Sequence, residues 1–165
     1  MEPITEFRTL SITADEPADR TAAGTVIDTG TELSLGEIDT TDEPQHLPVR
    51  VFWWRVADMG DAAEIANIRV WLSGAGELTG TNQWYMDITD TWTKGKTPIQ
   101  VMTGTPGAAP LARPAANLTS IGGGPIAGNG HGQTSKYIYL AGRIGLDETT
   151  GEKSGLTLHV TYDYH

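Results

Sequence analysis

The end of the chain carries the pattern that most restricts its fold. Apolar and polar residues alternate strictly over nine positions, in the order Leu156, Thr157, Leu158, His159, Val160, Thr161, Tyr162, Asp163 and Tyr164. A period of two places all the apolar side chains on one face of a strand, whereas a helix would scatter them around its axis. The pattern therefore predicts a half-buried closing strand, and with it a domain built from β-structure.

Shorter apolar segments extend this interpretation along the chain. Together with the closing strand they predict about nine short strands, and the other eight candidates are residues 7–13, 24–28, 33–38, 49–56, 68–72, 84–88, 98–102 and 138–146. Such a series, broken by frequent turn residues, predicts an all-β fold, either an antiparallel β-sandwich or a jelly roll.

Three segments allow more specific predictions. Residues 49–56 are apolar on both sides, which is typical of a central strand covered on each face, or of a strand with a bulge that switches its register. Residues 138–146 and 156–164 are separated by a polar stretch, so we expect them to form a β-hairpin. The best helical candidate, residues 61–67, is only about two turns long.

Composition narrows the class of protein. The length of 165 residues is that of one domain, so we expect a single domain over residues 1–165. The absence of cysteine excludes disulfides and thiolate metal sites. A formal net charge of -10 repels phosphate backbones, and no run approaches the roughly 20 apolar residues of a membrane span. We therefore expect no nucleic-acid partner, no membrane partner and no cleaved secretion signal.

Residues 103–135 break the regular pattern. They hold four prolines and eight glycines of the chain, which predicts neither helix nor regular strand. A long connection of this kind is usually either disordered or functional, for example a binding loop or an arm that contacts a neighbouring subunit.

No motif in the sequence specifies a catalytic reaction. The chain lacks a nucleophile elbow, a zinc-protease helix and a phosphate-binding loop, and its four histidines have no metal-ligand spacing. We predict no catalytic residue, no cofactor and no metal site. Acidic turns such as residues 39–43 and 58–61 are interpreted as solvated, with calcium binding left open.

Aromatic and loop residues are the candidates for binding. Trp92 lies in a polar, turn-like segment and is the best candidate for an exposed aromatic, with Tyr85 and Trp84 beside it in sequence. Trp71 points opposite to the apolar row of its strand, toward a second sheet or an interface. Three further contact candidates, all from the long loop, are Arg113, Asn129 and His131.

Three segments resemble a known group of proteins. The runs VRVFWWRV at 49–56, IANIRVWLS at 65–73 and GLTLHVTYDY at 155–164 are similar in style to β-sandwich structural proteins of tailed bacteriophage particles. The resemblance implies a non-enzymatic capsid decoration or accessory subunit that is made in the host cytoplasm and assembled into the virion. It also implies a homo-oligomer that contacts a major capsid protein or another virion protein and stabilises a larger assembly. Such proteins commonly contact their neighbours through extended arms or loops, so the resemblance implies an N-terminal arm at residues 1–6.

Two other classes of function stay open from the sequence. The first is a carbohydrate-binding or adhesin module that stacks surface glycans on Trp92, Tyr85 and Trp84. The second is a glycan-active or metal-dependent hydrolase, which requires a pair of Asp or Glu side chains at a suitable separation.

Overall fold

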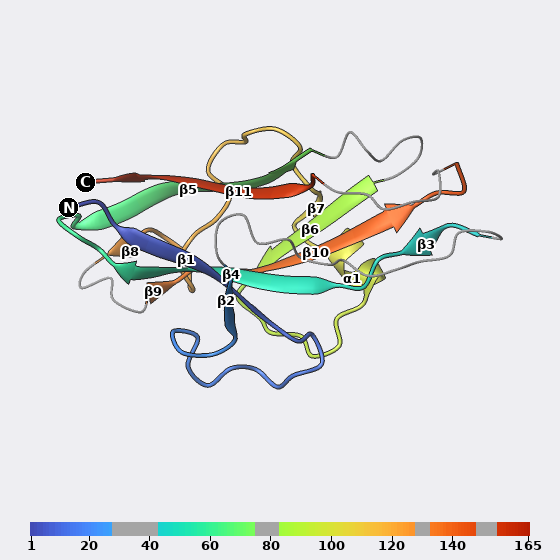
Figure 1. Cartoon of the computed structure of the whole chain (residues 1–165), viewed down its shortest axis with the longest axis horizontal. Helices are drawn as coiled ribbons and strands as arrows, with labels where there is room; N and C mark the ends of the chain where they lie inside the picture. Colours follow the sequence, from blue (N-terminus) through green and yellow to red (C-terminus); the bar gives the residue numbers. More distant parts are fainter. Residues whose placement is uncertain (28–42, 75–82, 128–132, 148–154) are drawn as a thin grey trace.

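The computed structural model describes residues 1–27, 43–74, 83–127, 133–147 and 155–165. In these ranges the chain forms two antiparallel β-sheets that pack face to face, together with one short helix (Figure 1). The predicted all-β fold class is therefore confirmed, in the form of a sandwich. The elements are β1 (Ile4–Leu10), β2 (Thr25–Ile27), β3 (Gln45–His46), β4 (Arg50–Asp58), β5 (Glu64–Ser73), β6 (Gln83–Thr89), α1 (Pro98–Met102), β7 (Pro106–Ala108), β8 (Ile126–Ala127), β9 (Gln133–Thr134), β10 (Tyr137–Ile144) and β11 (Thr157–Tyr164).

The two sheets differ in size. The eight-stranded sheet has the order β2-β1-β4-β10-β6-β7, and β3 and β9 add to it through β10 and β4. The three-stranded sheet has the order β11-β5-β8. The candidate strand at residues 33–38 lies outside the described residues.

Strand β4 confirms the prediction of a central strand. Its side chains alternate between two apolar clusters: Phe52, Trp54 and Val56 point between the sheets, while Val51 and Trp53 point to the opposite face. All five are at most 3% exposed. The run of apolar residues at 49–56 thus reflects a strand that is buried on both faces.

A third layer covers the outer face of the eight-stranded sheet. It consists of α1 and the segments 11–24 and 90–97. Segment 11–24 lies on the side away from the three-stranded sheet (Figure 1). The ring of Tyr137 lies at its centre, 5.9 Å from the ring of Trp53, with the Arg20 guanidinium 3.6 Å from its centroid. Burial raises the pKa of the Tyr137 hydroxyl to about 12.

The predicted hairpin of the last two strands is wrong. Strand β10 pairs with β4 and β6 in the eight-stranded sheet, whereas β11 pairs with β5 in the other sheet. The reason is that both faces of β10 are apolar: Ile138 and Leu140 face the sandwich core, and Tyr137 and Tyr139 face the third layer. A strand buried in this way belongs in the middle of a sheet.

Residues 98–102, predicted as a strand, form the short helix α1. Its start is specified locally, because Pro98 occupies the first turn and Thr97 and Gln100 form a reciprocal capping box. These contacts satisfy backbone donors that a five-residue helix cannot satisfy by itself.

The helical candidate at residues 61–67 is also wrong, because β5 begins within it. Ile65 and Ile68 are three positions apart, a helix-like spacing, yet both are buried in the sandwich core. A β-bulge between them makes this possible: the pairing with β11 shifts there, and Asn67 has a φ of 51°. Asparagine tolerates this left-handed conformation better than most residues.

The expected N-terminal arm is wrong for its second half. Residues 4–6 belong to β1, which pairs with β4. The Glu6 carboxylate accepts hydrogen bonds from Arg55 Nη1 at 2.6 Å and from Arg8 Nε at 2.7 Å. Burial by itself raises the pKa of Glu6, but the two guanidinium groups outweigh it and lower that pKa. The segment is therefore anchored on its own subunit.

The long loop packs on its own subunit as well. Its described part contains the short strands β7, β8 and β9, which pair with β6, β5 and β4 respectively, so the prediction of neither helix nor regular strand missed these pairings. Leu118 and Ile126, at 2% and 0% exposure, belong to the sandwich core. The loop supplies apolar residues that the sheets need, which the density of glycine and proline concealed.

Candidate functional site

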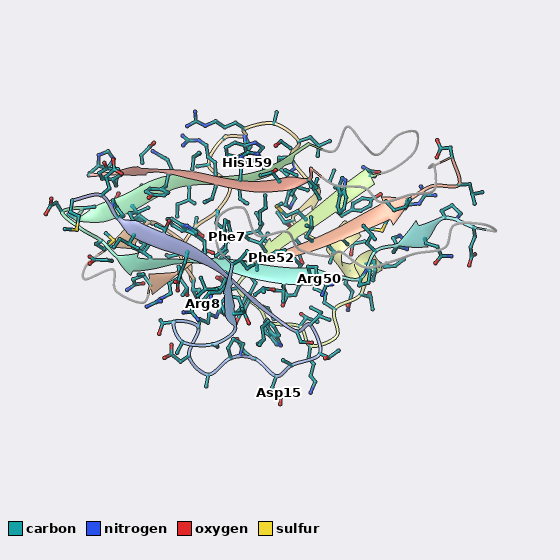
Figure 2. All side chains as sticks on the ribbon, viewed as in Figure 1. Phe7, Arg8, Asp15, Arg50, Phe52 and His159 are labelled. Atoms are coloured by element: carbon teal, nitrogen blue, oxygen red, sulfur yellow. The ribbon has the colours of Figure 1, made fainter. Side chains whose placement is uncertain are left out.

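The outer face of the three-stranded sheet presents aromatic and charged side chains to solvent. On β5 the inward row is completely buried, so the side chains between those positions point outward. Antiparallel pairing places β11 residues directly beside them, Trp71 opposite His159 and Arg69 opposite Thr161. We call this surface the Trp71 face, and it comprises Arg69, Trp71, Ser73, His159 and Asp163. Figure 2 labels His159 on this side of the sheet, with Phe7 and Phe52 between the two sheets.

Trp71 and His159 form a stacked pair at its centre. Their ring centroids are 5.0 Å apart and their planes differ by 8°. Ser73 Oγ lies 2.5 Å from His159 Nε2, so a hydrogen bond fixes the imidazole from the neighbouring strand. Both rings are half-buried and are held on regular strands. Their orientation is thus set before any partner binds.

Arg69 lies beside this pair. Its Nη1 donates to the Asn67 carbonyl oxygen at 2.8 Å and is 3.8 Å from Asp163 Oδ1. Asn67 Nδ2 in turn donates to Asp163 Oδ2 at 2.8 Å. The bulge at Asn67 therefore connects the charged end of the Trp71 face to the backbone of β5.

This arrangement suits recognition of another protein surface. Tryptophan and arginine are enriched among the residues that dominate binding energy at protein interfaces. Side chains already held in place lose little conformational entropy when a partner binds. A flat face with a stacked indole and a partly neutralised guanidinium offers both apolar contact area and charge-assisted hydrogen bonds.

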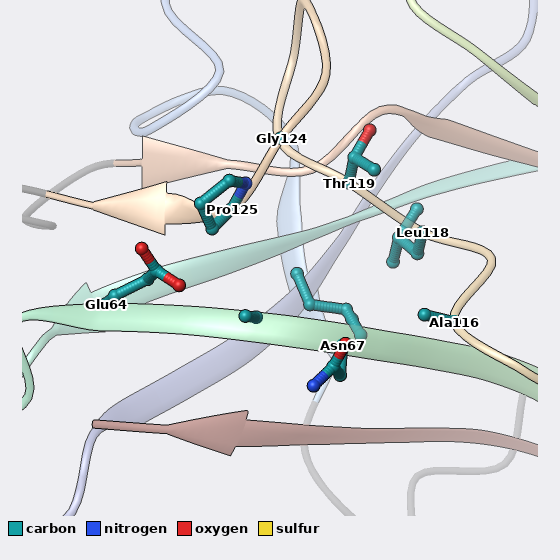
Figure 3. Close-up of a pocket in the computed structure, with 9 residues that line it drawn as sticks. Glu64, Asn67, Ala116, Leu118, Thr119, Gly124 and Pro125 are labelled. Carbon is teal, nitrogen blue, oxygen red and sulfur yellow. The ribbon is translucent and has the colours of Figure 1, made fainter.

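A small cavity lies beside the bulge, on the opposite edge of β5 (Figure 3). Its volume is about 260 Å³, and it is lined by Glu64, Ala66, Asn67, Ile68, Ala116, Leu118, Thr119, Gly124 and Pro125. Ligand pockets are usually between about 300 and 1,000 Å³. The cavity is below this range, and most of its lining is apolar or backbone.

The aromatic residues predicted to bind glycans are not exposed. Trp92 is half-buried in the third layer, where its ring centroid lies 5.2 Å from that of Tyr137 and its Nε1 donates to the Ala14 carbonyl oxygen at 3.1 Å. Tyr85 and Trp84 are 9% and 6% exposed. The interpretation of Trp92 as an exposed aromatic is wrong, because the third layer covers it.

The other predicted contact residues are scattered. Trp71 faces outward, as its position opposite the apolar row predicted. Arg113 is exposed in the loop between β7 and β8, whereas Asn129 and His131 lie outside the described residues. Among the candidates in the described ranges, Trp71 is the one that belongs to a cluster of aromatic and charged side chains on a surface.

The acidic turns follow structural roles in the described ranges. Asp58 Oδ1 accepts from the Gly60 N–H, Asp61 contacts the N-terminal ammonium group, and Asp90 Oδ1 accepts from the Gly122 N–H. In the part of the chain that the structure describes, no group of three or more His, Asp or Glu side chains is placed to hold a metal ion.

Sequence reasoning missed the role of His159. From the sequence, His159 is one polar residue of the alternating closing strand and carries no predicted role, although Trp71 and His159 each stand on the polar side of an alternating strand. The signal that joins them is the pairing of β5 with β11, which are separated by more than 80 residues. A single sequence does not reveal such a long-range register.

Comparisons with known proteins gave no relatives. A scan against protein-family models, a search of curated proteins and a search of solved structures each found no match. The described residues contain no helix long and apolar enough to cross a bilayer.

Proposed function

We propose that this chain is a non-enzymatic structural subunit of a virion, of the capsid decoration or accessory class, which oligomerises and binds a larger shell through the Trp71 face. The stacked pair of Trp71 and His159, fixed by Ser73 on the outer face of a sheet, is the observation that carries the proposal. The resemblance of residues 49–56, 65–73 and 155–164 to phage β-sandwich proteins supports it. The partner is then a major capsid protein or another virion protein.

The packing of the rest of the molecule supports this choice of surface. The outer face of the eight-stranded sheet is covered by the third layer, and the loop covers one edge of the three-stranded sheet. The Trp71 face is a regular sheet face whose side chains are half-buried, so each keeps part of its surface open to solvent. A rigid sheet face is also well suited to dock on the repeated surface of a shell.

The test is a binding measurement with Trp71→Ala. Shells are purified from the virus or prophage that encodes the chain, and the protein is co-sedimented with them. Loss of a central interface tryptophan costs about 2 kcal/mol or more, so we expect binding at least about 30-fold weaker. Ile99→Ala is the matched control, because Ile99 is 61% exposed on α1, in the third layer. It should bind as the unchanged protein does.

Two results would overturn the proposal: absence of the chain from purified particles, or shell binding that Trp71→Ala leaves intact. The carbohydrate-binding alternative is now restricted to Trp71, since Trp92, Tyr85 and Trp84 are covered. A glycan array signal that depends on Trp71, without any shell binding, would favour that alternative.

A further inference from the structure

Strand β11 ends the three-stranded sheet on one side. The opposite edge, that of β5, is covered: the Leu72 N–H donates to the Pro110 carbonyl oxygen, Val70 pairs with the Asn117 side chain, and Ile65 pairs with Ile126 of β8. Within the described ranges no strand pairs with the outer edge of β11. Among the residues that the structure describes, one long edge of the sheet is therefore covered and the other is open.

The register identifies the backbone groups at this open edge. In β5 the N–H groups of Val70 and Leu72 point away from β11, toward the loop. Because hydrogen-bonding direction alternates along an antiparallel strand, Arg69, Trp71 and Ser73 bond to β11 instead. The backbone N–H and C=O groups of their partners Thr161, His159 and Thr157 point toward β5. Leu158 and Val160 consequently direct their N–H and C=O groups outward.

The apolar row of β11 is incompletely covered. The equivalent row of β5, formed by Ile65, Ile68, Val70 and Leu72, is at most 1% exposed. By contrast Leu156, Leu158, Val160 and Tyr162 pack against the same core and stay only partly buried. Tyr164 is 45% exposed. Apolar surface is thus left at the same edge that offers free backbone groups.

The edge also has few of the features that normally prevent strand pairing; Asp163 is its one acidic residue. Natural edge strands are commonly protected by lysine, proline or short length. The eight residues of β11, TLHVTYDY, contain neither lysine, arginine nor proline. Edge strands of the other sheet are short by comparison, with three residues each in β2 and β7.

We propose that β11 pairs antiparallel with β11 of a second copy of the chain, around a twofold axis at Val160, so that two three-stranded sheets become one sheet of six strands. The proposal rests on the proposed assembly function, because it names the contact through which the subunit oligomerises. Residues 156–164 are symmetric about Val160, so this register uses the whole alternating segment.

The side chains fit this register. It places Leu158 beside Tyr162 of the second copy and Leu156 beside Tyr164 of the second copy, which covers the apolar row on both sides. On the outer face it places His159 beside Thr161, and Thr157 beside Asp163, of the second copy. No like charges stand directly opposite, a pairing that would destabilise the ladder. The two Trp71 faces then lie on the same side of the joined sheet, ready to bind one shell twice.

The experiment uses charge to test the register. Thr157 is exposed on the outer face of the sheet, so both Thr157→Lys and Thr157→Glu should fold. The first sets a lysine against Asp163 of the second copy, and the second sets two carboxylates together, twice per dimer. Sedimentation velocity at physiological salt should show a dimer for the unchanged chain. Because each dimer contains two such cross-strand pairs, the dissociation constant should fall roughly threefold or more for Thr157→Lys and rise as much for Thr157→Glu.

The net charge of -10 requires a control, because any added lysine reduces repulsion between copies. Ala18→Lys and Ala18→Glu make the same charge changes at an exposed position in the third layer, and they should shift the constant much less. Val160→Pro removes an outward N–H without breaking the bonds to β5, so it should abolish the dimer while cooperative unfolding persists.

The outcomes separate this proposal from the proposed function. A monomeric unchanged chain, or a dimer that responds equally to the Thr157 and Ala18 variants, would overturn the pairing of β11. If Val160→Pro fails to fold, the opposite shifts expected for Thr157→Lys and Thr157→Glu still test the pairing of β11. A dimer with the expected charge response that binds no shell would support the pairing and contradict the proposed function. Shell binding by a chain that forms no dimer would support the shell-binding part of the proposed function and contradict the pairing of β11.

Discussion

At the scale of single residues, a buried ion pair joins Asp87 of β6 to Lys96 of the third layer. Asp87 and Lys96 are 7% and 9% exposed, and the ammonium group contacts the carboxylate directly. Asp87 Oδ1 also accepts from the Thr105 N–H at 3.0 Å, and the Lys96 ammonium lies 4.3 Å from the centroid of the Tyr139 ring. Gly104 allows this approach, because a Cβ there would lie 2.2 Å from Asp87 Cγ.

Removal of one partner of this pair should destabilise the protein strongly. Lys96→Met retains the apolar stem but leaves a buried carboxylate without its counterion, which typically costs about 3 to 5 kcal/mol. The double variant Asp87→Asn with Lys96→Met removes both charges and keeps an acceptor for the Thr105 N–H. It should recover most of the loss. Urea unfolding at neutral pH measures both. Equal stability of Lys96→Met and the unchanged chain would contradict the importance of the pair.

At the scale of elements, the edge of β5 shows how an irregular segment can replace a strand. Asn117 Oδ1 accepts from the Val70 N–H at 2.8 Å and Asn117 Nδ2 donates to the Val70 carbonyl oxygen at 2.9 Å. One amide side chain thereby makes both hydrogen bonds that a neighbouring strand would make. The backbone N–H groups of Asn117 and Leu118 both donate to the Ile68 carbonyl oxygen, which extends the contact along β5.

Loss of this amide should weaken the covered edge. Asn117→Ala removes two hydrogen bonds and leaves the Val70 backbone groups without partners, so we expect a loss of about 1 to 3 kcal/mol in the free energy of unfolding. Hydrogen exchange of the Val70 amide should also become faster in this variant. Arg113→Ala, an exposed change in the same segment, should stay within about 0.5 kcal/mol. Similar effects of both variants would mean that the Asn117 bonds carry no special weight.

The elements also explain which predictions succeeded. The period of two in β11 and the doubly apolar run in β4 are local patterns, and both describe the structure correctly. The hairpin of β10 and β11 failed because strand pairing depends on contacts between distant segments, which hydrophobic alternation alone does not specify. The prediction of a strand at residues 98–102 failed because it ignored the capping box of α1, although Thr97, Pro98 and Gln100 carry a recognisable signal for a helix start.

The candidate site shows the same division. The outward orientation of Trp71 could be predicted, since it depends only on alternation within β5. Its stacking on His159 could not, since that requires the register between β5 and β11. The assignment of Trp92 to the surface failed because the polar residues around it belong to a segment that packs as a third layer over the sheet.

At the scale of the whole molecule, the three layers depend on one another. The long loop supplies Leu118 and Ile126 to the sandwich core and then returns through β9 to β4 of the eight-stranded sheet. It thus links both sheets within one subunit. A loop with this role is part of the folding unit. Its removal should therefore affect folding as well as binding.

Deletion of residues 104–132 should therefore abolish folding, and not merely binding. The deletion removes the buried side chains Ala109, Leu118 and Ile126 and uncovers the edge of β5. Loss of one large buried aliphatic side chain costs about 2 to 5 kcal/mol, so the loss of several approaches the 5 to 15 kcal/mol that stabilises a typical domain. Near-ultraviolet circular dichroism and urea unfolding should show no fixed packing and no cooperative transition, whereas Arg113→Ser should retain both. A deletion variant that unfolds cooperatively would show that the two sheets form the folding unit without the loop.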